Sequence, residues 1–462
     1  MPVGATSAAV EVRRARRSAP REDRSTRWFV FAVVGAATLA RGVGTFLYDA
    51  SYYWDAALAL VAGQGAPESD GNYYALRGVW TSVTYAPAAV LGNIGGETVA
   101  GVAVLFQNAL FLAAVAAFLV PAVLRPWYPS LGRPARWAAG GLVWLTLQGF
   151  APYPLVDVYA AAAVLLAVAL CARGDVRCLL GAGLLLGYAV NLRPAYVPAA
   201  VLLIVFAVVT SRLRAAAVAG GMVAALVPQL VYNLATTGAF SIAPRTTGRL
   251  VELQAGYAAY TVRYDTYAWQ METSARQFFC APGMAQSVGD LPTSTGELLR
   301  TFVVNLPGSA LFALEKAAAA LHWPVATPYS THSPGTNALF AVAVTLITVV
   351  GCAFLICTPF LRRAGEAPGA ARAGIRVAAV VVSGVVMLVG SATESRFAVV
   401  LVLVGVIGVT GLVEALPVRL SRHRWLVGVT AALALATIGL GYAGLAHPAP
   451  PGDVTPEICA GL

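Results

Sequence analysis

The stretch that decides the fold reads WFVFAVVGAATLARGVGTFLYDASYYWDAALAL and covers residues 28–60. Its first part, residues 28–47, is almost wholly apolar and has the length that an α-helix needs to cross a bilayer, about 20 residues. Two carboxylates, Asp49 and Asp55, follow this run directly among tyrosine and tryptophan side chains. The chemistry open to them depends on the side of the membrane on which they lie, and therefore on the topology of the whole chain.

Composition places the chain in the membrane. Of its 462 residues, 58% are hydrophobic and 11% are charged, and the mean hydropathy is +0.73. A soluble domain carries about 25% charged residues. The formal net charge of +10 could suggest a nucleic-acid partner, but the basic residues lie in short segments between apolar runs. We therefore expect membrane lipids as partners and no nucleic acid.

Apolar runs recur along the whole length and predict an all-α polytopic membrane protein. We expect about eleven transmembrane helices, with ten to thirteen compatible with the pattern. Prolines in the two shortest gaps, APYPL (151–155) and NLRP (191–194), prevent helix continuation and favour tight re-entry. The predicted helices are 28–47, 98–124, 137–152, 155–172, 178–192, 194–210, 215–235, 336–360, 377–391, 397–416 and 425–446.

Arginine distribution orients these helices. Six segments on one side (1–27, 125–136, 173–177, 211–214, 361–376 and 419–424) hold 21 of the 31 basic residues. Positive charge collects on the cytoplasmic side. We therefore expect a plasma-membrane protein with a cytoplasmic basic tail at 1–27, a single transmembrane domain at 28–446 and an external tail at 447–462. The run at 28–47 is longer than the core of a signal peptide, so we expect a retained first helix.

Two external segments are large enough to carry structure, residues 48–97 and 236–335. We expect amphipathic helices in both. In the second, GELLRTFVVNLPGSALFALEKAAAALHW has helical periodicity that breaks at Pro307, as expected of helices lying on the membrane surface. Cys280 and Cys459 both fall outside, where a disulfide is chemically allowed; a bridge and two free thiols are both compatible with the sequence.

Charged residues gather on the predicted outer face. They are Asp49, Asp55, Arg77, Asp157, Arg193, Arg245, Arg249, Glu394 and Arg396. Charges at the edge of a bilayer are unfavourable unless they are paired or hydrated, and so they indicate a functional site. For Asp55, a solvated position on a helix is as compatible with the sequence as a functional role. The neighbouring aromatic residues are also typical of interfacial anchors.

Chemistry on this face has a constraint, because nucleotide-activated donors stay in the cytoplasm. An outer-face transferase must therefore draw its activated group from a lipid carrier. Arginine binds the phosphate of such a carrier with a permanent charge and a forked geometry. Since phosphate is a good leaving group, one carboxylate acting as general base on the acceptor hydroxyl suffices. No metal-ligand spacing appears, and no cofactor is indicated.

Several motifs resemble the GT-C glycosyltransferases, in particular the protein O-mannosyltransferase and lipid A aminoarabinose transferase group. YDASYYWDAALALVAGQG resembles the first outer loop of that family, and LRGVWTSVTYAPAAVLG is similar to its second amphipathic helix. LLLGYAVNLRPAYVPAAVLL resembles its Gly–Arg–Pro junction, and VPQLVYNLATTGAFSIAPRTTG resembles its Pro-Trp-x-x-Arg-Asn stretch. ESRFAVVLVLVGVIGV is similar to its late Glu-x-Arg-Tyr element.

The sequence departs from the family at four positions. Ala50 stands where a second acid is common, Gln229 and Tyr232 replace the Trp and Arg of the Pro-Trp-x-x-Arg-Asn stretch, and Phe397 replaces the late Tyr. Without the second acid, an acidic pair that binds a metal is not expected.

The resemblance implies a polyprenyl-phosphate sugar donor, inversion at the anomeric carbon, and an acceptor (glycan, lipid or protein) on the outer face. By match, Asp49 is the general base, and Asp55 is the other catalytic candidate. Glu394 either orients Arg396 or caps its helix. The candidate donor-phosphate ligands are Arg396, Glu394, Arg193, Arg245 and Arg77.

Two other functions stay open. One is a transporter or flippase of lipid-linked glycans, although such proteins favour broken helices, internal repeats and polar groups at mid-membrane. The other is a non-catalytic protein of cell-envelope assembly, which the departures from the family pattern favour.

Overall fold

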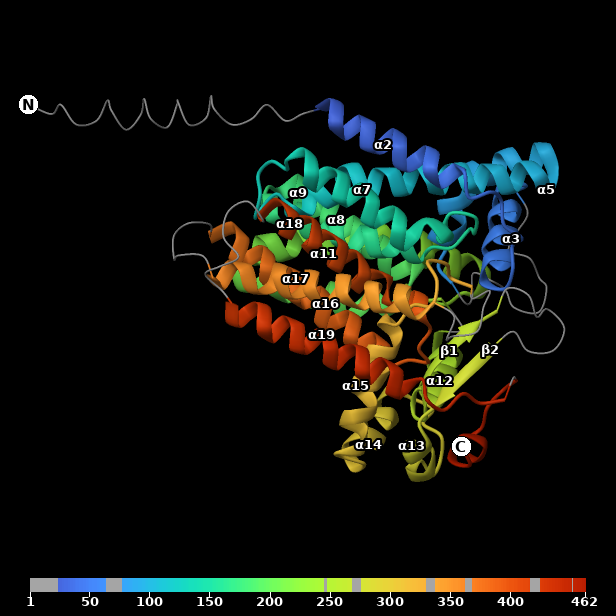
Figure 1. Ribbon diagram of the computed structural model, residues 1–462. Coiled ribbons are helices and arrows are strands. Elements are labelled where there is room, and N and C mark those ends of the chain that lie inside the picture. The colour runs from blue at the N-terminus through green and yellow to red at the C-terminus, as the bar shows by residue number, and fades with distance from the viewer. Residues whose placement is uncertain are drawn as a thin grey trace, which may run out of the picture.

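A bundle of long, nearly parallel helices makes up most of the chain (Figure 1). The computed structural model describes residues 24–63, 77–244, 247–267, 276–329, 337–361, 368–415, 424–450 and 452–462. Each of the eleven predicted apolar runs overlaps a helix of the bundle. These helices are α2 (Arg24–Leu39), α5 (Trp80–Ala114), α7 (Arg133–Leu147), α8 (Asp157–Arg173), α9 (Val176–Leu192), α10 (Val197–Thr210), α11 (Arg212–Thr237), α16 (Ala338–Leu361), α17 (Pro368–Val389), α18 (Val399–Ala415) and α19 (Arg424–Gly444).

The bundle is that of a membrane-embedded helical protein. Within the described residues, six helical segments are long and apolar enough to cross a membrane. They are Trp80–Leu124, Arg212–Thr237, Ala338–Thr358, Gly369–Val389, Ser395–Ala415 and Val427–Gly444.

Glycines let the central helices approach closely. A Cβ added at Gly351 of α16 would lie 1.9 Å from the carbonyl oxygen of Gly405 in α18, and one at Gly183 of α9 would lie 2.0 Å from that of Val218 in α11. Only a residue without a side chain fits such contacts, which are the usual way of packing helices inside a membrane. These contacts fix α18 and α9, two of the helices whose ends carry site residues.

The helix ends differ from prediction at three places. The first helix ends at Leu39 rather than near 47, and α17 begins at Pro368, nine residues before its predicted start. Helix α5 begins at Trp80, inside the predicted outer loop, and a non-helical Gly96 (φ +73°) separates its first part from the predicted membrane run. A π-helical turn, η1 (Val115–Leu119), then joins α5 to α6 (Val120–Leu124).

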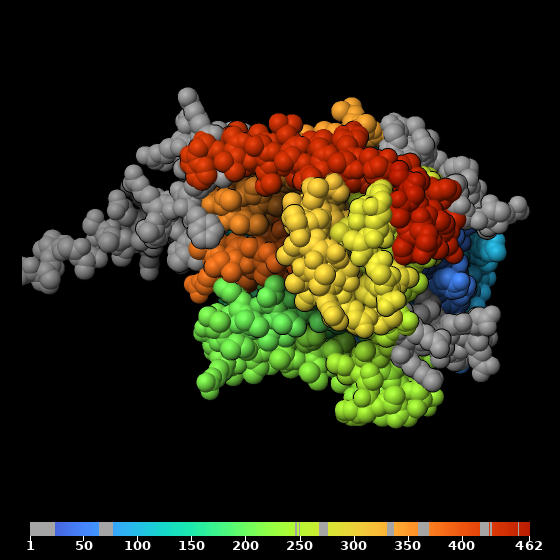
Figure 2. Space-filling model, turned by 90° about the horizontal axis from the view of Figure 1, so that it is seen from below, coloured from blue at the N-terminus to red at the C-terminus, as the bar shows by residue number. Residues whose placement is uncertain are grey.

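The segments predicted to lie outside hold short helices and, in addition to the predicted helices, a two-stranded β-sheet. The helices are α3 (Asp49–Val61), α12 (Thr247–Ala258), α13 (Pro282–Ser287), α14 (Thr295–Val304) and α15 (Gly308–Leu321), and the predicted break at Pro307 is confirmed. Strands β1 (Thr261–Thr266) and β2 (Arg276–Cys280) pair antiparallel. In Figure 2, α14 and α15 form the yellow mass beside α19, which is red.

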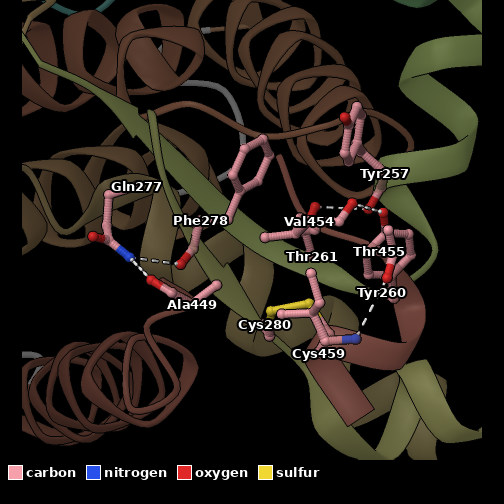
Figure 3. The surroundings of a disulfide bond; sticks show 11 residues. Tyr257, Tyr260, Thr261, Gln277, Phe278, Cys280, Ala449, Val454, Thr455 and Cys459 are labelled. Atoms are coloured by element: carbon pink, nitrogen blue, oxygen red, sulfur yellow. Dashed lines mark hydrogen bonds between the residues drawn. A yellow bond between two sulfur atoms is a disulfide. The ribbon is translucent and has the colours of Figure 1, made fainter. Parts of the chain in front are cut away.

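The C-terminal segment is packed rather than a free tail. The backbone of Ala449 donates to the carbonyl of Phe278 (2.9 Å), and the Tyr260 hydroxyl donates to the carbonyl of Val454 (2.9 Å). Helix α20 (Pro456–Ala460) places Cys459 against β2, where it forms a disulfide with Cys280 (Figure 3). Of the two readings open from sequence, the bridge is therefore the one present.

Loss of this disulfide should destabilise the outer segment. The double substitution Cys280→Ser with Cys459→Ser should lower the free energy of unfolding by about 2–5 kcal/mol, because the bridge closes a long loop. Protease digestion in detergent would show faster cleavage after residue 447. Cys178→Ser, which alters a free cysteine, is the control. Equal protection of both variants would contradict a structural role for the bridge.

Candidate functional site

Asp49 is positioned by an unusual backbone conformation. It is the first residue of α3, where the helix dipole favours a negative charge. The preceding residue, Tyr48, has a φ of +48°, which non-glycine residues rarely adopt. Tyr48 is held by a hydrogen bond from its hydroxyl to the carbonyl of Tyr267 (3.2 Å), and the Tyr329 hydroxyl donates to the carbonyl of Leu47 (2.9 Å). The chain is therefore fixed on both sides of the turn that presents Asp49.

Arg396 reaches Asp49 from the other end of the sequence. Its Nη2 lies 2.7 Å from Asp49 Oδ2, although 347 residues separate the two. Its Nε donates to Glu394 Oε2 at 2.6 Å, so one guanidinium joins two carboxylates. Glu394 makes no capping hydrogen bond to the turn η4 (Ser395–Ala398) that follows it. Of its two predicted roles, the contacts of Glu394 fit the orientation of Arg396.

The outer sheet holds Glu394 in place. The backbone amide of Tyr264 in β1 donates to the carbonyl of Thr393 (2.8 Å), and Tyr264 forms a parallel bridge with Glu394. The predicted carboxylate–guanidinium pair thus depends on a strand that the sequence interpretation missed.

Two further arginines lie near this pair. Arg77 lies 4.0 Å from Asp49 and donates from its Nε to the Tyr53 hydroxyl (3.1 Å). Arg193 forms an ion pair with Asp157, the first residue of α8, and its guanidinium lies 4.7 Å from the centre of the Phe397 ring. Arg193 is extended because Pro194 follows it, which ends α9 at this point.

A cavity of about 320 Å³ adjoins these arginines. Arg77, Asp157, Arg193 and Arg396 contribute to its lining, and most of the remaining wall is apolar. The apolar part comes from α10, α12 and α17 and includes Pro198, Leu250, Val251, Val386 and Met387. An anionic group attached to an apolar chain matches both parts of this surface.

The described ionisable side chains of the site balance in charge. Three guanidiniums face three carboxylates, but the carboxylates are not equivalent: Asp49 is 28% exposed, Asp157 3% and Glu394 1%. Burial raises the pKa of Asp49, but the surrounding guanidiniums, Arg396 first among them, outweigh it and hold that pKa well below its ordinary value. Asp49 is therefore ionised, and it is the most exposed of the three carboxylates.

Two guanidinium nitrogen atoms of the site can donate further hydrogen bonds. Arg396 Nη1 and Arg193 Nε are buried and have no hydrogen-bond partner in the part of the chain that the structure describes. Buried donors are normally satisfied. Both residues line the cavity, so an anion bound there could satisfy them.

An amide network positions Arg77 and Arg193. Asn191, two residues before Arg193, accepts from the backbone of Trp80 (3.0 Å), and its carbonyl accepts from Gly78 (3.2 Å). Gln229 of α11 accepts from the backbone of Val79 (3.0 Å) and from the Asn191 side chain (3.2 Å). Gln229, which departs from the family pattern, thus fastens α11 to the segment that carries Arg77. Sequence patterns did not reveal this role, since isolated amides have no characteristic spacing.

The remaining candidates stand apart. Asp55 is exposed on α3, six residues and thus more than a turn and a half beyond Asp49, and the structure does not bring it to the cluster. Arg245 lies outside the described residues. The structure therefore gathers Asp49, Arg77, Arg193, Glu394 and Arg396, together with Asp157.

Comparisons with known proteins give no relative on which to draw: no protein-family model, no curated protein and no solved structure matches this chain.

Breaking the buried half of the cluster should destabilise the protein. Glu394→Gln leaves Arg396 with one carboxylate in a buried setting, which we expect to lower the free energy of unfolding by about 3 kcal/mol. Titration of the protein in mixed micelles with a denaturing detergent measures this change. Glu97→Gln, the same substitution at an exposed position of α5, should stay within about 0.5 kcal/mol of the unaltered protein. A similar loss in both variants would contradict the assigned role of Glu394.

Proposed function

We propose that this protein is an integral membrane glycosyltransferase of GT-C type. It moves a sugar from a polyprenyl-phosphate donor to an acceptor on the extracytoplasmic face, with Asp49 as general base. One observation carries the proposal: a carboxylate at a strained turn contacts an oriented arginine, and that arginine lines a largely apolar cavity.

The proposed topology has eleven spans, with the N-terminus in the cytoplasm and the C-terminus outside. It is supported by the alternation of arginine-rich ends along the eleven bundle helices. On this topology the Asp49 cluster, the sheet and α12–α15 lie on the outer side of the plasma membrane. The exposed apolar side chains of α14, Leu299, Val303 and Val304, would then rest on the membrane surface.

The donor phosphate would bind at the arginine atoms that lack a hydrogen-bond partner in the described structure, Arg396 Nη1 and Arg193 Nε. Because the described guanidiniums and carboxylates of the site balance in charge, an added phosphate would compete with the carboxylates for the guanidiniums. Asp49 is the most exposed of the three, whereas Glu394 and Asp157 are buried. The phosphate would therefore displace Asp49 from Arg396, while Glu394 keeps the guanidinium in place through its Nε.

This displacement would prepare Asp49 for proton transfer. A carboxylate paired with arginine is a weak base, and its pKa rises once the pair is broken. Asp49 would then accept the proton of the acceptor hydroxyl as the acceptor oxygen attacks the anomeric carbon. The bond from that carbon to the phosphate oxygen breaks, and the electron pair leaves with the phosphate, which Arg396 and its neighbours stabilise. Attack opposite the leaving phosphate inverts the anomeric carbon.

A transporter of lipid-linked glycans is the second candidate. The observation that favours it is another cavity, of about 800 Å³, at the opposite end of the bundle. Purified protein incubated with a panel of polyprenyl-phosphate sugars separates the two functions, because only a transferase releases free polyprenyl phosphate in an acceptor-dependent manner.

Asp49→Asn should abolish transfer without unfolding the protein. The amide keeps the shape of the carboxylate but cannot accept the proton, so turnover should fall by roughly 10²–10⁴-fold. The measurement is release of polyprenyl phosphate from the donor panel. Asp290→Asn, at an exposed position before α14, is the matched control and should keep full turnover. An Asp49→Asn protein with unaltered turnover would refute the assignment of the base.

The pH dependence should report the displacement. Asp49 must be ionised to act, so the rate falls as pH drops through its pKa. In the free protein that pKa is depressed, so the acidic limb of kcat/KM should lie below the ordinary range of a carboxyl group. With donor bound and the ion pair broken, the acidic limb of kcat should lie at higher pH. Two limbs at the same pH would argue against displacement by the donor.

A further inference from the structure

Another cavity follows α8 to the end of the bundle away from Asp49. Its volume is about 800 Å³, and α5, η1, α8 and α9 contribute to its walls together with residues 125–131. In Figure 1 this end is on the left, where α2 begins, whereas α3 and the two strands are on the right. The reaction proposed for Asp49 makes no use of this cavity.

The cavity is elongated along the helices. Tyr159, Ala162, Ala163, Leu166 and Arg173 line it from a single helix, α8. Their spacing follows one helical face, and the first and last lie about 21 Å apart along the helix axis. The space therefore follows most of the length of α8.

One end of this space is aromatic. Phe111 and Tyr159 stack with ring centres 3.9 Å apart, and the Tyr188 hydroxyl lies 2.7 Å from that of Thr84. Phe111, Tyr159 and Tyr188 all line the cavity, on the side toward the Asp49 cluster. A ligand that extends along α8 would end against these rings.

The other end is cationic. Arg27, Arg125, Arg136 and Arg173 line it; Arg125 and Arg173 are exposed, and Arg136 is 3% exposed. No aspartate or glutamate occurs among the described residues that line the cavity. In contrast to the Asp49 cluster, the described wall of this cavity contributes arginines and no carboxylate.

The π-helical turn η1 contributes to this wall. Val115, Ala117, Phe118 and Leu119 of η1 line the cavity, and the Arg27 guanidinium lies 5.8 Å from the centre of the Phe118 ring. Such turns are rare and occur often at functional sites, because they redirect side chains on an otherwise regular helix.

We propose that this cavity binds a single-chain lipid phosphate monoester, with the phosphate at the arginines and the chain along α8. A phosphate monoester carries more charge than a diester and offers several oxygens to guanidinium groups. One long chain fits a space that follows one helix face and ends at aromatic rings. On the proposed topology this lipid comes from the cytoplasmic leaflet. Its binding does not depend on the reaction proposed for Asp49.

Native mass spectrometry of delipidated protein tests the site, with polyprenyl phosphate as the probe. Replacement of both exposed arginines, Arg125→Gln with Arg173→Gln, should weaken binding by roughly thirtyfold. The matched control is Arg177→Gln with Arg212→Gln, two exposed arginines at the same end that do not line the cavity; it should bind as the unaltered protein does. Equal binding by the two double variants would overturn the proposal.

The binding experiment is carried out with Asp49→Asn in every sample, so that any lipid bound at the Asp49 cluster contributes equally to all measurements. Polyprenol without phosphate and inorganic phosphate alone should each bind at least tenfold more weakly, since each lacks one half of the ligand. Ala163→Leu puts a larger side chain into the cavity from α8. It should weaken the binding of polyprenyl phosphate but leave the binding of a short-chain alkyl phosphate unaffected. Preference for two-chain phosphatidylglycerol over polyprenyl phosphate would also overturn the assignment.

Discussion

A guanidinium buried between two carboxylates is the interaction on which the arrangement of the candidate site depends. Removing such charges from water is unfavourable by several kcal/mol for each ion unless partners replace the water. Arg396 has both partners, Glu394 on its Nε and Asp49 on its Nη2. Since Glu394 precedes α18, Asp49 begins α3 and β1 holds Glu394, three distant segments must assemble before the charges are compensated.

The helical bundle and the segment that contains the sheet position different residues of the site. Glycine contacts fix α9 and α18 at separations that no larger residue allows, and these helices carry Arg193 and Arg396 at their outer ends. The outer segment supplies the strand that holds Glu394 and the residue, Tyr267, that holds Tyr48. The disulfide fastens the C-terminal segment to the same sheet. Mobility of the outer segment would therefore change the geometry of the acid and the arginine directly.

The two cavities differ in a way that charge explains. At the Asp49 cluster, equal numbers of described arginines and carboxylates meet, so an anion that binds there competes with carboxylates for the guanidiniums. The described wall of the other cavity carries arginines and no aspartate or glutamate, so an anion there meets no carboxylate of the wall. On the proposed function, the first arrangement would couple donor binding to the freeing of a base, and the second would retain a lipid phosphate.

Hydrophobic runs by themselves determined that the chain is a helical membrane protein and where the helices of its bundle lie, because the thickness of the bilayer imposes a length and composition that local sequence displays. The acids and arginines at helix ends were visible for the same reason. Only the tertiary structure decided that Asp49 meets Arg396 while Asp55 does not, since that contact joins residues 347 apart. The short strands, the partners of Gln229 and the pairing of Cys280 with Cys459 likewise depend on contacts between distant segments, for which five or six residues of local pattern hold no signal.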